Sequence, residues 1–143
     1  MHLDRRPATE ADIPFLLSLR RETMEGHLAA SGASITDESH LARLMHHYDC
    51  SEVLISDGNP VGLLKVRRLP YEWEIVQIQL SPHLQGRGIG RSLLESVLTD
   101  AAVAGADVKL SVLKANPAKQ LYERLGFEVV GEDAHEYYMR RAA

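Results

Sequence analysis

The 143-residue chain is 45% hydrophobic and 25% charged, a composition typical of an ordinary soluble domain and not of a disordered or disulfide-stapled chain. Its 16 basic and 20 acidic residues give a formal net charge of -4, which argues against nucleic-acid binding and favours a neutral or cationic substrate. With the single cysteine Cys50 and no apolar run near the roughly 20 residues that cross a bilayer, we expect one cytoplasmic domain over residues 1–143 without membrane contact.

The first third of the chain is predicted to contain a strand and two helices. His2 to Arg6 is predicted as a short strand. Thr9 with Asp12 resembles a capping box, which would begin a first helix. Leucine and methionine residues at helical spacing predict a second helix over Asp37 to His47.

A hairpin follows in this prediction. The apolar runs Glu52 to Ser56 and Val61 to Val66 flank Asp57-Gly58-Asn59-Pro60. This tetrapeptide favours a turn because Gly and Asn tolerate positive φ.

Glu72 to Leu80 is predicted as the next strand because it is rich in β-branched residues. The two-residue period of a strand puts Glu74 on the same face as Val76 and Ile78, and it puts Ile75 on the opposite face.

Glycine and proline mark the ends of two further helices. Gly88 opens a third helix and Gly105 stops it, whereas Asn116 and Pro117 open a fourth helix that Gly126 closes. The remaining strands are predicted over Asp107 to Leu113, Phe127 to Gly131 and His135 to Met139.

The glycine-rich segment Gln85-Gly86-Arg87-Gly88-Ile89-Gly90 lies between the predicted strand and the third helix, an arrangement that suits phosphate. Unpaired backbone N–H groups and the positive end of the helix dipole meet there, and glycines let an anion approach the backbone. The glycine spacing does not fit the dinucleotide fingerprint. A P-loop would need glycine at Gln85 and lysine at Arg91.

Two motifs together resemble the GNAT N-acetyltransferase superfamily. Gln85-x-x-Gly88-x-Gly90 is similar to the family's pyrophosphate loop. Asn116-Pro117-Ala118-x-x-Leu121-Tyr122-x-x-x-Gly126-Phe127 is similar to the segment after the family's fifth strand. The resemblance covers nearly the whole chain, although the first third agrees only in pattern. It implies an α/β fold with a mixed sheet of about seven strands and four helices.

The resemblance implies that the cosubstrate is acetyl-CoA. The backbone from Gln85 to Gly90 would bind the pyrophosphate, the strand around Ile78 to Leu80 would pair with the pantetheine arm, and Asn116 would contact that arm while also capping the helix. Lys114, Lys119 and Arg87 are candidates for the 3′-phosphate. The full set of predicted coenzyme-binding residues is Ile78, Gln79, Leu80, Gln85, Gly86, Arg87, Gly88, Ile89, Gly90, Arg91, Ser92, Asn116 and Lys119.

The implied reaction is direct attack of a primary amine on the thioester in a ternary complex. Because an alkyl ammonium has a pKa of about 10.4, it must lose a proton before it attacks. By resemblance Glu74 is the candidate base, with Glu72 as the alternate; the N–H of Ile78 would stabilise the oxyanion, and Tyr122 would protonate the leaving thiolate.

Neither motif identifies the acceptor, which could be a small molecule or a protein amine. In this family the segment Arg20 to His27 would help to shape its pocket. A non-catalytic acyl-CoA sensor and an interaction protein without ligand are the alternatives, and a homodimer is left open. No metal is expected, because adjacent helical residues such as His46 and His47 point about 100° apart.

Overall fold

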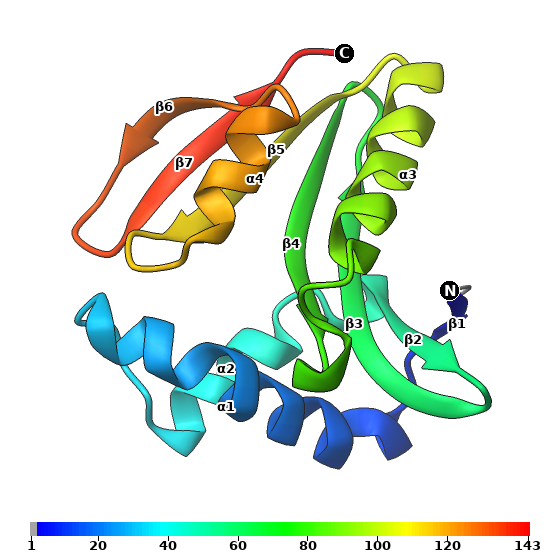
Figure 1. Cartoon of the computed structure of the whole chain (residues 1–143), viewed down its shortest axis with the longest axis vertical. Coiled ribbons are helices and arrows are strands. Elements are labelled where there is room, and N and C mark those ends of the chain that lie inside the picture. The colour runs from blue at the N-terminus through cyan, green and yellow to red at the C-terminus, as the bar shows by residue number, and fades with distance from the viewer. Residues whose placement is uncertain (1–2) are drawn as a thin grey trace.

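A seven-stranded sheet forms the centre of the protein in the computed structural model, which describes residues 3–143 (Figure 1). The strand order is β1-β2-β3-β4-β5-β7-β6, and β4–β5 is its only parallel pair among the described residues. The strands are β1 Asp4–Pro7, β2 Ser51–Ser56, β3 Asn59–Arg68, β4 Glu72–Leu80, β5 Asp107–Leu113, β6 Glu128–Glu132 and β7 Glu136–Arg141. The α-helices are α1 Ile13–Ala30, α2 Asp37–Met45, α3 Ile89–Val103 and α4 Ala118–Arg124. The predicted mixed sheet with four helices is confirmed.

The two faces of the sheet carry separate hydrophobic cores. One core packs Leu94 and Val97 of α3 and Tyr122 of α4 against β2 to β5 and β7. The other packs Leu16 of α1 and Leu44 of α2 against β2 and β3. Helices α3 and α4 therefore cover one face, and α1 and α2 cover the other. None of the helices within residues 3–143 has the length and apolar character of a membrane span.

Most predicted element boundaries are confirmed, with local differences at the ends. His2 of the predicted first strand lies outside the described residues. The hairpin turn is tighter than predicted: only Asp57 and Gly58 form it, with φ of 51° and 78°, so β3 already begins at Asn59. Two central residues of positive φ are what a two-residue type I′ turn requires.

The capping box of Thr9 and Asp12 is confirmed, and it closes a short 3-10 turn, Glu10–Asp12, that leads into α1. The backbone N–H of Thr9 donates to Asp12 Oδ2 over 2.7 Å. Arg6 adds two hydrogen bonds to the same carboxylate, of 2.8 and 2.7 Å. The hydrogen bonds from Arg6 are the main reason that the pKa of Asp12 falls to about 2. This ion pair ties β1 to the start of α1.

Strand β4 does not keep the predicted alternation, because it contains a β-bulge. Lys65 of β3 pairs with Gln77, whereas the next residue of β3, Val66, pairs with Ile75, so Val76 is the extra residue. A bulge shifts the side-chain period by one. As a result Ile75 and Ile78 pack against the same core cluster, and the prediction that Glu74 shares a face with Ile78 is wrong.

The same place in β4 marks the end of its pairing with β5. The parallel register runs from Glu72 opposite Asp107 to Ile75 opposite Leu110 and stops there. Beyond that point β4 stays with β3, while β5 stays with β7. Figure 1 shows β4 and β5 diverging downward, with α3 beside one strand and α4 beside the other. Because a bulge adds twist to its strand, it assists this separation.

Lys65 fixes the position of α2 over the sheet. Its side chain is fully buried, and its Nζ donates to the carbonyl oxygens of Leu44 over 2.6 Å and of His46 over 2.7 Å. These carbonyls lie at the C-terminal end of α2, where helices leave acceptors unpaired and where a positive charge is favourable. Burial, followed by the nearby Arg43, lowers the pKa of Lys65 to about 8.

We expect Lys65→Met to lower the free energy of unfolding by about 1 to 3 kcal/mol, because two buried carbonyls lose their donor while the packed volume is nearly kept. Chemical denaturation followed by circular dichroism measures this change. Lys109→Met is the matched control: Lys109 is an exposed lysine ion-paired with Glu72, and its loss should cost less than about 1 kcal/mol. Equal losses in the two variants would contradict the anchoring role of Lys65.

Candidate functional site

The separation of β4 and β5 opens a cleft with two connected parts. The first part, of about 240 Å³, lies among α1, α2, β4, β5 and the start of β7. The second part, of about 280 Å³, lies among α1, the end of β4, the glycine-rich loop and α4. The two parts share the five lining residues Met24, Ile78, Gln79, Asn116 and Tyr122. These five residues, which we call the junction, connect one hollow to the other.

The glycine-rich loop borders the second part of the cleft. Gly86 and Gly88 have φ of 77° and 74°, a backbone conformation that suits glycine. Within residues 3–143, no group accepts a hydrogen bond from the backbone N–H groups of residues 86–91. A side-chain atom built at either glycine would meet nothing within 4 Å. The loop therefore presents open, unpaired donors at the start of α3, an arrangement that fits a phosphate group.

The side chain of Gln85 holds the loop to the strand before it. Its Nε2 donates to the carbonyl oxygen of Leu80, the last residue of β4, over 3.1 Å. The N–H of Ser92 donates to the carbonyl of Gly88 and begins the hydrogen-bond ladder of α3. The side chain of Gln85 thus stabilises the loop locally, and the unpaired donors of the loop come from its backbone.

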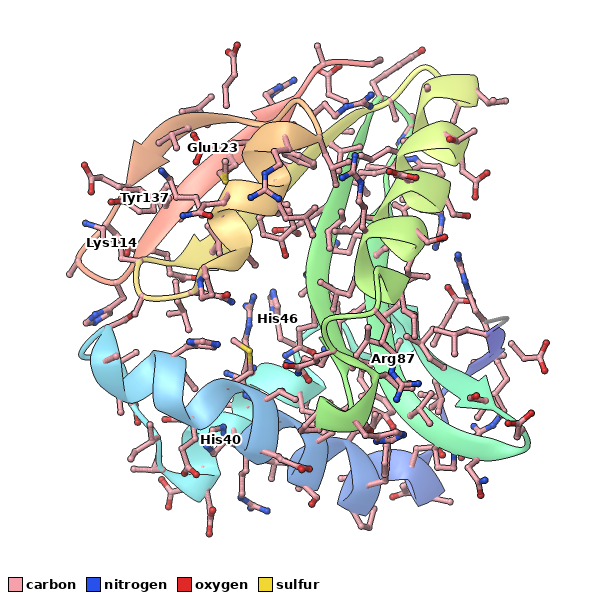
Figure 2. The ribbon with its side chains drawn as sticks, in the orientation of Figure 1. His40, His46, Arg87, Lys114, Glu123 and Tyr137 are labelled. Atoms are coloured by element: carbon pink, nitrogen blue, oxygen red, sulfur yellow. The ribbon has the colours of Figure 1, made fainter. Side chains whose placement is uncertain are left out.

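The basic residues predicted near the coenzyme lie on two sides of the cleft. Arg87 lies at the glycine-rich loop, and Lys114 lies in the half that contains Tyr137 (Figure 2). Lys119 of α4 pairs with Glu123 over 3.3 Å and lies 4.9 Å above the ring of Tyr137. Arg91 pairs with Glu95 one turn further along α3. Arg87 and Arg91 are both exposed.

Asn116 caps helix α4 and also lines the cleft, the two places expected for it from the sequence. Its Oδ1 accepts a hydrogen bond from the N–H of Ala118 over 2.9 Å and so caps the start of α4. It also belongs to the junction and borders both parts of the cleft. The cap uses the oxygen only, which leaves the Nδ2 donors for a ligand.

Tyr122 lies at the centre of the junction. Its side chain comes from α4, is 8% exposed, and packs edge-on against Phe127 with ring centroids 5.8 Å apart. Burial raises the pKa of Tyr122 to about 12. Its hydroxyl makes no hydrogen bond to any residue between 3 and 143, so it remains a free donor beside the cleft.

Glu74 borders a neighbouring hollow and not the two-part cleft itself. This hollow shares Leu110 and Ser111 with the first part of the cleft. The Glu74 carboxylate is 28% exposed and lies 3.6 Å from Arg67. Glu72, the alternate candidate, is held by Lys109 over 3.0 Å and by Arg140 over 3.2 Å. Glu74 is therefore the less constrained carboxylate of the two.

Several polar residues of the first part of the cleft were not identified in the sequence. They are Arg43, Gln77, His135 and Glu136. Arg20 and Met24 also line it, and they fall in the segment Arg20 to His27 for which a pocket was predicted. The helical spacing of α2 could not identify Arg43 as a cleft residue, because the residues beside it, Arg20 and Val76, come from α1 and β4. Gln77 could have been found from the two-residue period of the strand, because it shares a face with Gln79, which was predicted.

His46 and His47 differ from their prediction. Helix α2 ends at Met45, and His47 adopts a left-handed φ of 53°, so the two residues are not successive helical positions. Their rings lie close together, with centroids 4.1 Å apart. Residues 3–143 nevertheless contain no group of three or more His, Cys, Asp or Glu side chains that could hold a metal ion.

Comparison with known proteins agrees with this architecture. Residues 46–129 match the profile of the acetyltransferase (GNAT) domain family. The chain is 32% identical over 148 aligned positions to an uncharacterized protein of Mycobacterium leprae, covering 94% of this chain and 39% of that protein. It is 39% identical over 99 positions to the N-alpha-acetyltransferase RimI of Mycobacterium tuberculosis, covering 60% of this chain and 61% of RimI. The chain thus spans less than two thirds of either relative.

A solved structure shares the fold along the whole chain. The PaiA N-acetyltransferase of Thermoplasma acidophilum, crystallised in complex with coenzyme A, superposes with a TM-score of 0.76 over 100% of both chains. Its sequence identity of 17% supports similarity of fold alone.

The loop geometry leads to a test of anion binding. Gly88→Asp should abolish binding of coenzyme A in calorimetry, because it adds a side chain and a negative charge where the unpaired N–H groups converge. Gly105→Asp is the matched control: Gly105 follows the far end of α3 with φ of 71° and equally open surroundings, so it carries the same backbone strain. Unchanged affinity in Gly88→Asp, or equal loss in both variants, would contradict the assignment of the loop.

Proposed function

The chain belongs to the GNAT acetyltransferase family, and from that premise we propose that it transfers the acetyl group of acetyl-CoA to a primary amine by direct attack in a ternary complex. The junction carries this proposal, because a coenzyme arm in the second part of the cleft and an acceptor in the first part would meet at Tyr122. The 39% identity to an N-alpha-acetyltransferase supports an α-amino group as the acceptor.

We propose that the loop donors and the end of β4 position the thioester. The N–H groups of residues 86–91 would hold the pyrophosphate, and the stretch Ile78 to Leu80, which has left β5, would offer its free edge to the pantetheine arm. The amine nitrogen then forms a bond to the thioester carbon while the amine loses a proton. The carbon–sulfur bond breaks, and the coenzyme leaves as a thiolate that takes up a proton. The N–H of Ile78 at the junction is the proposed donor to the oxyanion.

Tyr122 is the proposed donor to the leaving thiolate. Because its pKa lies at about 12, the hydroxyl keeps its proton throughout the working pH range. A thiol has a pKa of about 8.5, so complete transfer from tyrosine would be uphill by roughly 5 kcal/mol. We therefore propose that Tyr122 stabilises the developing thiolate by a hydrogen bond, and that the thiolate finally takes up, by way of water, the proton that the attacking amine nitrogen loses.

We expect Tyr122→Phe to lower kcat about 10- to 100-fold with nearly unchanged affinity for acetyl-CoA, because only a hydroxyl that acts on the leaving group is removed. Steady-state kinetics and calorimetry measure the two quantities. Tyr137→Phe is the control, since Tyr137 does not line the cleft among the described residues. Equal turnover of wild type and Tyr122→Phe would reject this role.

Glu74 is the proposed general base, acting through water. Its carboxylate borders the hollow that shares Leu110 and Ser111 with the acceptor part of the cleft, so a chain of water molecules could connect it to the amine. Glu136 lines the acceptor part directly, so it is the alternative candidate for the general base.

Glu74→Gln should reduce activity most at low pH, where the free amine is scarcest, and rising pH should partly restore it. The fall is expected at the lower end of the range of about 10²- to 10⁴-fold, since the base acts through water. The pH–rate profile of kcat/KM, measured beside that of Glu136→Gln, identifies the base. A Glu74→Gln profile that overlays wild type, with a loss only in Glu136→Gln, would transfer the role to Glu136.

A screen for thiol release with acetyl-CoA and a library of amines tests the function as a whole. Release that depends on an added amine supports the transferase. Acetyl-CoA binding without release for any amine would favour a sensor module, and absence of binding would favour an interaction protein.

A further inference from the structure

Two arginines from different helices face the acceptor part of the cleft. Arg20 lies near the middle of α1 and is only 7% exposed, and Arg43 lies near the end of α2. Both line the first part of the cleft. Burial lowers the pKa of Arg20 to about 10, and the positive charge of Arg43 contributes to this shift. A pKa of about 10 keeps the Arg20 guanidinium charged at neutral pH.

These two arginines lack a carboxylate partner. Within residues 3–143, neither forms an ion pair within 4 Å. Arginines 5, 87, 124 and 141 also form none there, but of these six only Arg20 is buried, and only Arg20 and Arg43 line the cleft. Arg20 uses its Nε to donate to His40 Nδ1 over 3.2 Å, and Arg43 uses one Nη to donate to the carbonyl of Val76 over 3.3 Å. The remaining guanidinium donors have no acceptor among the described residues. Buried charges are usually paired, so this arrangement points to an anionic ligand.

Contacts within and beneath α1 and α2 restrain the two arginines. His40 of α2 is fully buried beneath Arg20 and lies 3.6 Å from Glu25 of α1. Lys65 fixes the end of α2 through the carbonyls of Leu44 and His46, and thereby fixes Arg43 next to them. A guanidinium that is already oriented loses less entropy when it binds a carboxylate through two parallel hydrogen bonds.

The opposite wall carries the complementary charge. Glu136, the first residue of β7, lines the same part of the cleft and is close enough to raise the pKa of Arg20. His135 beside it is tied to the end of α1 by a 2.8 Å contact between its Nδ1 and the carbonyl oxygen of Ser31. The cleft therefore has two cations on the helical wall and one carboxylate on the sheet wall.

We propose that the acceptor is a small zwitterion of the amino-acid class, with its carboxylate bound by Arg20 and Arg43 and its ammonium group directed toward Glu136 and the junction. This proposal rests on the proposed acetyl transfer and specifies its substrate class. The volume of about 240 Å³ suits a small molecule. An amino acid also carries the α-amino group that the similarity to the N-alpha-acetyltransferase RimI supports as the acceptor. A zwitterion has no net charge, so it agrees with the neutral acceptor that the net charge of -4 favours, while the local pair of cations selects its carboxylate end.

Amino acids compared with their own carboxamides test the proposal. Each amide keeps the side chain and the amine but loses the carboxylate. Loss of that negative charge also lowers the pKa of the amine, so intrinsic reactivity favours the amide and any preference for the acid must come from the site. We expect kcat/KM for the best amino acid to exceed that for its amide by about 10- to 100-fold.

The arginine variants identify the source of that preference. Arg43→Gln should raise KM for the amino acid about 10-fold or more, leave the amide nearly unchanged and keep acetyl-CoA affinity, whereas Arg43→Lys should retain part of the preference. Arg20→Gln should act in the same direction, and its thermal unfolding shows whether it folds. Arg21→Gln is the matched control, because the neighbouring Arg21 pairs with Asp37 and does not line the cleft among the described residues.

Each alternative outcome overturns the proposal in a recognisable way. An acid-to-amide ratio near one, or a ratio that Arg43→Gln and Arg20→Gln leave unchanged, rejects the carboxylate site while the transferase stands. Faster reaction with phosphoethanolamine than with any amino acid would show that the arginines bind a phosphate and not a carboxylate. Equal reaction with peptides that have a free N-terminus would show that the acceptor is a peptide or protein and not a small molecule. Acetyl-CoA binding without thiol release for any acceptor rejects the transferase itself.

Discussion

The separation of β4 from β5 is the structural constraint on which the site depends. Parallel pairing ends at Ile75 and Leu110, and from there each strand keeps only its outer neighbour. A sheet interior would otherwise use every backbone donor and acceptor between the two strands. Because they part, the end of β4 has a free edge inside the protein, and the cleft lies beside it. The bulge at Val76 adds twist at this point and places Ile78 on the core face.

Two kinds of positive charge divide the cleft into regions of different chemistry. At the glycine-rich loop, backbone N–H groups and the start of α3 provide partial charges that require no particular side chain. At the helical wall, Arg20 and Arg43 provide full charges in a fixed orientation. Tyr122 lies between these regions with a neutral hydroxyl that burial keeps protonated. The region proposed for the coenzyme is thus separate from the region proposed for the acceptor, and the two meet at the hydroxyl of Tyr122.

Polar groups buried for structural reasons hold this arrangement together. Lys65 carries a buried charge that three carbonyls at the end of α2 satisfy, and His40 supports Arg20 from beneath. Such groups cost free energy to desolvate, and their hydrogen bonds compensate for part of it. Their effect is to fix α2 against β3, which determines where Arg43 enters the cleft. The stability of the helical wall and the orientation of the proposed acceptor site therefore have the same physical origin.

The sequence by itself determined most of the elements, the glycine-rich loop and the place of Tyr122 on α4. Local patterns define them: glycine spacing marks the loop at Gly86 and Gly88, proline and asparagine open α4, and Tyr122 follows at a fixed distance along the same helix. Only the tertiary structure decided the faces of β4 and the acceptor side. A bulge depends on the register between two strands, so alternation within β4 could not reveal that Glu74 and Ile78 lie on opposite faces. Arg20, Arg43 and Glu136 come from α1, α2 and β7, and their charges become one site only because packing brings these distant segments together.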